Sequence, residues 1–225
     1  MASEHRDGAP IGRRTVLGLL GLGAAGVLGG QWAQQGMAKV VSHDPTQLLS
    51  LLPLGDTFRF YSVTGSVPAR TAATYRLRVS GLLTHAMTYT MADLAALPQT
   101  VLVRDFHCVT GWHVPQVHWS GVRLSVLLDQ VAPSAGATAV RFFSFDGTYT
   151  ENMTIEQARR GDVIVASRML GGAITHDHGG PVRMYSGAMY GYKSTKWLSG
   201  IELTDRVVPG YWETRGYGLN GFIQP

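Results

Sequence analysis

The sequence contains a single cysteine, Cys108, in the stretch RDFHCVTGWHV (residues 104–114). Free cysteine is among the most buried residue types and usually packs as a small hydrophobic side chain. Here Arg104 and His107 lie close by in sequence, and positive charge lowers a thiol pKa toward the thiolate that binds soft metals. Gly111 also lets the backbone approach a bulky ligand. Cys108 therefore has two interpretations, an inert core residue or a metal-binding thiolate.

A second group of candidate ligands lies in the loop THDHGG. His176 and His178 are two residues apart, and with Cys108 and His113 they could form a mixed nitrogen and sulfur site for zinc or copper. His and Asp also suit an ordinary solvated turn. No CxxC or HxxxH pattern supports a closed zinc site. An exported, non-redox zinc- or copper-binding protein that uses His176, His178 and Cys108 is kept as the alternative function.

A third group is basic: Arg183 follows HGGPV, and Lys193 and Lys196 lie in YGYKSTK. Glycines and small hydroxyl residues between separated cations suit a phosphate or another anion, held by backbone amides and side chains. Ordinary surface lysines are the competing interpretation. The two loops flank a predicted strand, PVRMY, and so we expect them to converge.

Strands and short helices must position these residues. TYRLRVSGLL alternates apolar and polar residues, which predicts a strand with one buried face, and Gly81 permits a turn after it. TVLVRDF predicts a strand that ends at or just before Cys108. In WSGVRLSVLLDQV, apolar residues at helical spacing predict one buried helix face: Leu124, Leu127, Leu128 and Val131.

Two capping patterns predict further short helices. Thr90 precedes Asp93 by three residues in TMADLAALP, and Thr154 precedes Gln157 in TIEQARRGDVIVAS, where Gly161 ends the helix before a β-branched strand. AVRFFSFDG, PVRMY and KWLSGIELTD predict more strands. The expected fold is α+β, with mixed β-sheets and short helices, and the 28 glycines and 10 prolines suit its many loops.

The first 38 residues have the pattern of an export signal. Arg13 and Arg14 precede an apolar, glycine-rich run over residues 15–30, and residues 36–38 form a small-x-small cleavage pattern. The run is shorter than the roughly 20 residues that span a bilayer. We therefore expect a twin-arginine-type signal over residues 1–38 and one domain over residues 39–225. The net charge is +4, but the Lys and Arg residues form no stripe interleaved with aromatic residues. This disfavours nucleic acid as a partner.

Read together and in order, several motifs closely resemble the molybdopterin-binding domain of the sulfite oxidase family: FHCVTGW, WSGVRLSVLLD, HGGPVRMY, MYGYKSTKWLSGIELTD and GYWETRGY. The resemblance runs from about Thr57 onward. Its exported bacterial branch includes the catalytic subunit of the periplasmic protein-methionine-sulfoxide reductase. The resemblance implies the sulfite-oxidase molybdopterin-binding fold, with molybdenum and molybdopterin as cofactors.

The resemblance also implies roles for particular residues. The cysteine of the family's C-V-x-x-W segment is the one protein ligand of molybdenum, and it falls on Cys108. Arg183 would bind the pterin and its phosphate. The other cofactor contacts that it implies are Tyr61, Ser62, Ser144, His178, Ser194, Thr195 and Lys196, with His178 standing where the reductase branch has asparagine. We expect Arg104 and His107 to line the substrate side of the metal.

The hypothesis is thus an exported molybdenum-dependent oxidoreductase that transfers an oxygen atom, with two electrons, on a small sulfur- or nitrogen-containing substrate. A soft thiolate suits a metal that a pterin dithiolene already holds. The family's dimerisation and haem domains have no counterpart in the chain, and so we expect a monomer. Electrons would pass to or from a separate partner, such as a membrane haem protein or a quinone-linked protein.

Overall fold

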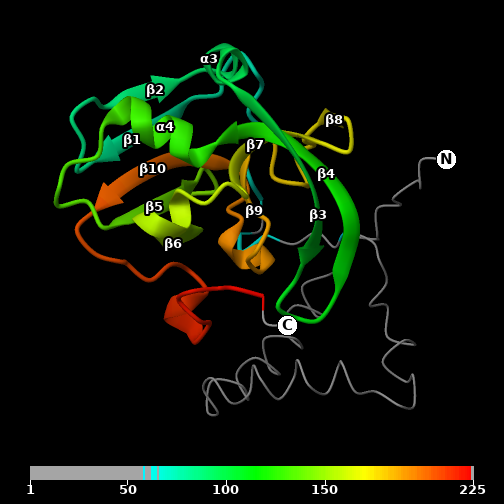
Figure 1. The fold of residues 1–225 in the computed structure, drawn as a ribbon. Coiled ribbons are helices and arrows are strands. Elements are labelled where there is room, and N and C mark those ends of the chain that lie inside the picture. The colour runs from blue at the N-terminus through cyan, green and yellow to red at the C-terminus, as the bar shows by residue number, and fades with distance from the viewer. Residues whose placement is uncertain (1–57, 59–61, 65, 224–225) are drawn as a thin grey trace, which may run out of the picture.

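The computed structural model of the protein describes residues 58, 62–64 and 66–223. The expected signal over residues 1–38 and the candidate Tyr61 lie outside the described residues. In this described part of the chain, ten strands form two five-stranded sheets, joined by short helices, as the α+β prediction requires (Figure 1). Within the described part of the chain, no helix is long and apolar enough to cross a membrane.

The first sheet has the strand order β2-β1-β10-β5-β6, in which only the β1–β10 pair is parallel. Its strands are β1 (Leu77–Gly81), β2 (Met87–Tyr89), β5 (Ala139–Ser144), β6 (Thr150–Thr154) and β10 (Leu198–Thr204). The predicted strands at TYRLRVSGLL, AVRFFSFDG and KWLSGIELTD all lie in this sheet.

The second sheet has the order β3-β4-β7-β8, and β9 pairs with β7. Its strands are β3 (Gln99–His107), β4 (His113–Arg123), β7 (Val163–Met169), β8 (Gly172–Ala173) and β9 (Arg183–Ser186). The long β3–β4 hairpin curves along one side of the molecule (Figure 1). As predicted, the chain reaches Cys108 immediately after a strand, β3.

Short helices connect the strands: α3 (Met91–Ala96), α4 (Leu124–Val131), α5 (Ile155–Ala158) and the 3-10 helices η2 (Gly191–Lys193) and η3 (Glu213–Arg215). Both predicted capping boxes form, at Thr90 and at Thr154. The apolar face of α4 is buried in a core that also takes side chains from both sheets. A second core surrounds Cys108 with aromatic side chains, including Phe106, Trp112 and Trp119.

Strand β4 was not predicted, and its backbone explains why. The sequence HVPQVHWSGVR contains Pro115, and Gln116 adopts a positive φ of 53°. At the same point the pairing with β3 shifts register between Arg104 and Phe106. This irregularity breaks the period of two that identifies a strand in sequence. Beyond it, Val117 and Trp119 are buried on alternate positions.

A fully buried ion cluster ties η2 and η3 to β6. The Lys193 ammonium donates to Glu151 Oε1 at 2.9 Å, to the Asn152 carbonyl at 3.0 Å, and to Glu213 Oε1. Sequence reasoning grouped Lys193 with Arg183 and Lys196 as a candidate anion site. The structure corrects this grouping, because the Lys193 ammonium is fully buried and its hydrogen bonds go to Glu151, Asn152 and Glu213.

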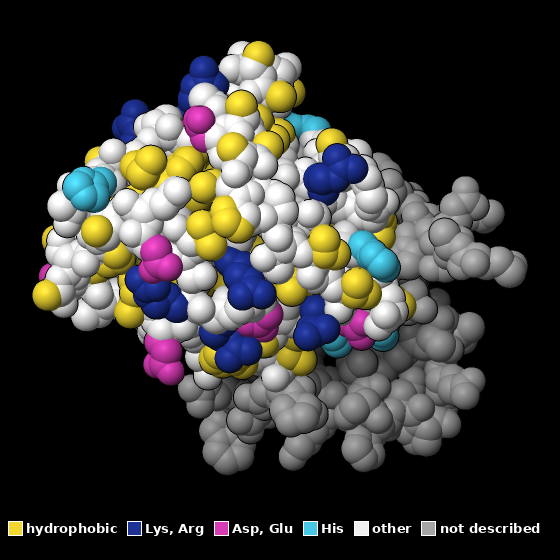
Figure 2. Space-filling view, turned by 45° about the horizontal axis from the view of Figure 1, so that its top comes forward, with side chains coloured by type: hydrophobic (Ala, Val, Ile, Leu, Met, Phe, Trp, Pro, Cys, Tyr) yellow, Lys and Arg dark blue, Asp and Glu magenta, His cyan; other side chains and the backbone are white. Residues whose placement is uncertain are grey.

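On the face shown in Figure 2, Lys and Arg side chains form several separate groups, with Asp and Glu side chains among them. Positive charge on this face is therefore dispersed and mixed with negative charge. One exposed ion pair joins Arg159, just after α5, to Asp129 of α4 at 2.7 Å.

Replacing Leu127 with alanine should lower the free energy of unfolding by about 2–5 kcal/mol, because it opens a cavity under α4 where the side chain is fully buried. Urea unfolding followed by circular dichroism measures the change. Asp129→Ala on the same helix is the control, since its exposed ion pair contributes at most about 1 kcal/mol. Equal losses in the two variants would contradict a core role for the α4 face.

The buried ion cluster should make stability depend on pH. Burial raises the pKa of Glu151 from 4.5 to about 8, although the Lys193 charge opposes the shift. Between these two values the folded chain holds a proton on Glu151 that the unfolded chain has lost. The free energy of unfolding should therefore fall as pH rises from 5 to 8.

Glu151→Gln should flatten this pH dependence, because the neutral amide resembles the protonated acid. Unfolding midpoints measured at several pH values test this expectation. Glu156→Gln, on an exposed position of α5, is the matched control and should keep the wild-type slope. A wild-type slope in Glu151→Gln would show that the proton resides elsewhere.

Candidate functional site

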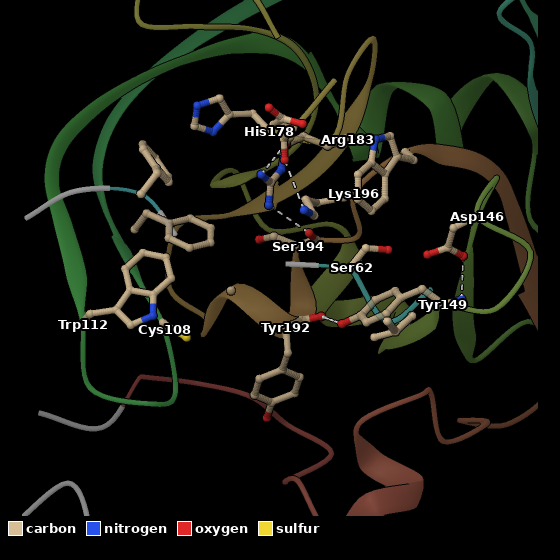
Figure 3. Close-up of a pocket in the computed structure, with 16 residues that line it drawn as sticks. Ser62, Cys108, Trp112, Asp146, Tyr149, His178, Arg183, Tyr192, Ser194 and Lys196 are labelled. Atoms are coloured by element: carbon tan, nitrogen blue, oxygen red, sulfur yellow. Dashed lines mark hydrogen bonds between the residues drawn. The ribbon is translucent and has the colours of Figure 1, made fainter. Parts of the chain in front are cut away.

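A cleft brings together residues from six separate segments, most of them loops (Figure 3). It contains about 680 Å³ of empty space, part of it open to solvent. Its lining residues are Phe58, Ser62, Val63, Phe106, Cys108, Trp112, Asp146, Tyr149, Asp177, His178, Arg183, Gly191, Tyr192, Ser194, Lys196 and Trp197.

Cys108 lies at one end of the cleft, beside Trp112 (Figure 3). It is 8 % exposed, and its Sγ atom lies 3.1 Å from the Thr110 hydroxyl. The tight turn between β3 and β4 positions it: the Trp112 carbonyl accepts from the Cys108 amide, and Gly111 adopts a φ of 96°. The surrounding walls at this end are mainly aromatic. This end therefore offers one soft ligand atom in an apolar setting.

Arg183 lies away from Cys108 in the cleft and is buried (Figure 3). Its Nη1 donates to the His178 carbonyl at 2.7 Å, and its Nη2 donates to the Ser194 carbonyl at 3.1 Å. One guanidinium thus joins the two loops that flank β9, which confirms that these loops converge. The ring of His178, also buried, packs edge-on against Phe58 at 4.8 Å.

Lys196 completes a cationic wall, defined here as Arg183, Ser194 and Lys196. Its ammonium donates to the Asp177 carbonyl at 3.2 Å and lies 4.1 Å from the centre of the Trp197 ring. Burial lowers the pKa of Lys196 to about 7, and the Arg183 charge lowers it further, while Asp177 and Asp146 oppose the shift. An anion at this wall would favour the charged form of the lysine.

The Ser and Thr residues predicted to contact the cofactor do not all line the cleft. Ser194 and Ser62 line the cleft, whereas Ser144 and Thr195 do not. The Ser144 hydroxyl accepts from the Asp146 amide at 3.1 Å, beside the cleft. Thr195 is fully buried between two cleft residues, and its hydroxyl has no hydrogen-bond partner among the described residues. This buried polar atom fits a loop built around a polar ligand.

Arg104 and His107 are not part of the cleft lining. Arg104 is exposed and donates to the carbonyl of its neighbour Val103. The His107 ring stacks on His113 with centres 5.5 Å apart, and its Nε2 lies 4.0 Å from a carboxylate oxygen of Asp105. Burial lowers the pKa of His107, and His113 lowers it further. Both side chains belong to the outer part of the hairpin.

Sequence reasoning missed several residues of the cleft. Tyr149 and Tyr192 line it, and the Tyr149 hydroxyl donates to the Tyr192 carbonyl at 2.6 Å. Tyr217, from the GYWETRGY motif, lies near Cys108: burial raises the pKa of its hydroxyl, and the Cys108 charge raises it further. Aromatic residues in loops carry no period, and only the resemblance of the whole motif pointed to this segment.

The alternative zinc or copper site is not supported. Among the described residues, no group of three or more His, Cys, Asp and Glu side chains is arranged to hold a metal ion. His178 and Cys108 both line the cleft, but His176 is exposed and packs its ring on Trp197 at 5.7 Å. The three proposed ligands therefore form no such group.

Comparisons with known proteins agree with this geometry. An uncharacterized oxidoreductase, YuiH, of Bacillus subtilis is 33 % identical over 159 residues, which are 70 % of this chain and 80 % of that protein. The protein-methionine-sulfoxide reductase catalytic subunit MsrP of Ralstonia nicotianae is 26 % identical, with 95 % of this chain and 76 % of that protein covered.

A solved structure supports the fold. The sulfane dehydrogenase SoxCD from Paracoccus pantotrophus superposes with a TM-score of 0.58 at 21 % sequence identity. The match covers 63 % of this chain and 41 % of the SoxCD chain, so this chain spans about two fifths of that protein. The predicted fold is confirmed at this level.

The family model described as the oxidoreductase molybdopterin binding domain matches residues 64–212, which is more than half of the chain. The match includes Cys108, Arg183 and Lys196. It confirms the predictions that the protein is an enzyme and that its cofactor is molybdopterin with molybdenum. On the strength of this match and of the cleft, the chain belongs to the molybdopterin-binding oxidoreductases that include the sulfite oxidases.

Proposed function

We propose that the protein is a molybdenum-dependent oxidoreductase in which the Cys108 thiolate binds molybdenum and an oxygen atom is transferred to or from a small substrate. The observation that carries the proposal is the cleft itself, which has a soft sulfur at one end and a cationic wall in another part of its lining. A pterin that holds a metal by its dithiolene and ends in a phosphate has the complementary chemistry.

The chain's own residues would hold this cofactor in a fixed orientation. Arg183 is held by the carbonyls of His178, Met184 and Ser194, and its fixed positive charge would lie beside the pterin or its phosphate. Ser194 and Lys196 would bind the phosphate, and Ser62 and His178 would contact the pterin. Ser144, Thr195 and Tyr61 stay proposed contacts of the same cofactor. The bound group supplies the two-electron redox chemistry.

The lining of the cleft favours an uncharged S-oxide or N-oxide over an oxyanion as substrate. The two cations that line the cleft among the described residues belong to the cationic wall, and the walls near Cys108 are aromatic. Arg104 and His107, proposed for the substrate side, lie on the outer part of the hairpin. An anion such as sulfite would therefore lack a counter-charge beside the metal.

Export through the twin-arginine-type signal stays part of the proposal, and so do the monomeric state and a separate electron partner. A similar protein of Azospira oryzae, 31 % identical over 183 residues, is described as a putative subunit of protein-methionine-sulfoxide reductase. This name supports an enzyme whose electrons pass through another subunit, for which a membrane haem protein or a quinone-linked protein is the proposed class.

Cys108→Ala should remove molybdenum and all redox activity, because the protein's ligand atom is lost, while the fold stays intact. Metal content and activity are measured on protein expressed in a host that makes molybdopterin, with circular dichroism as the check on folding. Thr84→Val, on an exposed turn, is a control that should load and turn over normally. A wild-type chain that folds without molybdenum or pterin would refute the proposed function, and full turnover in Cys108→Ala would refute the ligand assignment.

The substrate class is tested by comparing the reduction of S-oxides and N-oxides, with a reduced dye as donor, against the oxidation of sulfite with an oxidised acceptor. We expect higher kcat/KM for the neutral oxides. A preference for sulfite would show that a cation reaches the metal from outside the described cleft lining.

Cofactor retention should depend on the charge of Lys196. Because burial lowers its pKa to about 7, the lysine of the empty cleft is charged below pH 7 and loses its charge above it. Retention of the phosphate-bearing pterin should therefore weaken as pH rises from 6 to 8.5. Hydrogen bonds to charged groups contribute about 1.5–3 kcal/mol, and so Lys196→Met should weaken retention roughly 10- to 100-fold at pH 6.

Pterin per chain after gel filtration at each pH gives the measurement. Lys196→Arg keeps the charge at every pH and should bind without this pH dependence. If Lys196→Met retains the cofactor as the wild type does, the lysine does not bind the phosphate.

A further inference from the structure

We propose that Thr110 tunes the metal site through the sulfur of Cys108: its hydroxyl donates a hydrogen bond to the bound thiolate and thereby raises the reduction potential of molybdenum. The inference rests on the proposed function, because it takes Cys108 as the metal ligand. The geometric observation is the 3.1 Å separation between Thr110 Oγ1 and Cys108 Sγ.

The direction of this hydrogen bond follows from the chemistry of ligation. In a free thiol either group could donate to the other. A metal-bound cysteine is a thiolate without a proton, and so it can only accept. The Thr110 hydroxyl is then the donor, and the hydrogen bond becomes charge-assisted when the metal is bound.

The turn between β3 and β4 holds Thr110 in place without using its side chain. The Cys108 amide donates to the Trp112 carbonyl at 2.9 Å, and the Gly111 amide donates to the Cys108 carbonyl at 3.1 Å. These backbone hydrogen bonds place Thr110 two residues after the ligand, on the exposed side of the turn. Cys108 itself is only 8 % exposed, so little water can take the place of the hydroxyl.

A hydrogen bond to a coordinating sulfur withdraws electron density from it and makes it a weaker donor to the metal. A weaker donor stabilises the reduced metal relative to the oxidised metal, which raises the reduction potential. Thr110 thus acts as a positioning residue, through Cys108, and contacts neither substrate nor metal. Its removal should change the potential of the metal more than it changes the fold.

The test compares three variants of the full chain, loaded with cofactor in a host that makes molybdopterin. Thr110→Val keeps the shape and removes the donor, and Thr110→Ser keeps the donor. Thr84→Val, the control, replaces an exposed threonine that precedes β2. Redox titration followed by electron paramagnetic resonance gives the midpoint potentials of molybdenum. We expect a lower potential in Thr110→Val and wild-type potentials in the other two.

Equal potentials in Thr110→Val and the wild type would overturn the proposal. So would a Thr110→Ser variant that behaves like Thr110→Val, because the shift would then come from packing and not from the hydroxyl. Metal content per chain is measured for each variant, so that a change in loading is not read as a change in potential.

A second measurement separates this inference from the proposed function. Cys108 is the chain's single cysteine, so its thiol can be titrated in the cofactor-free chain by absorbance of the thiolate. In Thr110→Val the loss of the hydroxyl donor should raise the pKa of the Cys108 thiol. In Thr110→Ser this pKa should stay at the wild-type value. Identical titrations in all variants overturn the hydrogen bond. A normal shift in a protein that never binds molybdenum overturns the proposed function instead, and with it the claim about potential.

Discussion

The guanidinium of Arg183 holds the site together. It is buried, and its nitrogens donate to carbonyls on either side of β9, at His178 and at Ser194. A buried cation is unfavourable unless its donors are satisfied, and here backbone carbonyls satisfy them. Because the buried guanidinium of Arg183 needs these acceptors, it fixes the two loops relative to each other. The aromatic rings of Phe106 and Trp119 lie 5.5 and 5.3 Å from the same guanidinium, which links the cationic wall to the Cys108 end.

Two lysines that are three residues apart, Lys193 and Lys196, have different electrostatic roles. Lys193 is fully buried and joins Glu151 and Glu213, so that η2, β6 and η3 are held together. Lys196 lies beyond the end of η2 and faces the cleft. The first lysine contacts two buried acidic side chains, and the second is placed beside another cation. Only the second therefore gains from an anionic ligand, which would favour its charged form.

The sequence predicted those features whose signals are local. Helix caps at Thr90 and Thr154, the buried face of α4 and the strand leading to Cys108 all follow from neighbouring residues, and all are present. Strand β4 was not predicted because Pro115 and the positive φ of Gln116 interrupt its alternation of buried and exposed residues. For the site, the ordered motifs identified Cys108, Arg183 and Lys196, because each family motif carries one of them.

The sequence could not show in which direction individual side chains project. Lys193 and Lys196 stand in one motif, and a regular helix would place residues three apart on the same face. The 3-10 helix η2 ends at Lys193, and Ser194 leaves helical geometry with φ −99° and ψ 74°. The two side chains therefore diverge. Arg104 and His107 raise the same difficulty. His107 is adjacent to Cys108, and adjacent residues of an extended chain project to opposite sides. Arg104 lies before the register shift of β3 between Arg104 and Phe106, so the simple alternation of a strand does not place it with Cys108. Proximity in sequence to Cys108 thus did not bring either residue into the cleft. Thr110 shows the opposite case, because a turn with a left-handed glycine folds the chain back and brings a residue two positions later onto the sulfur.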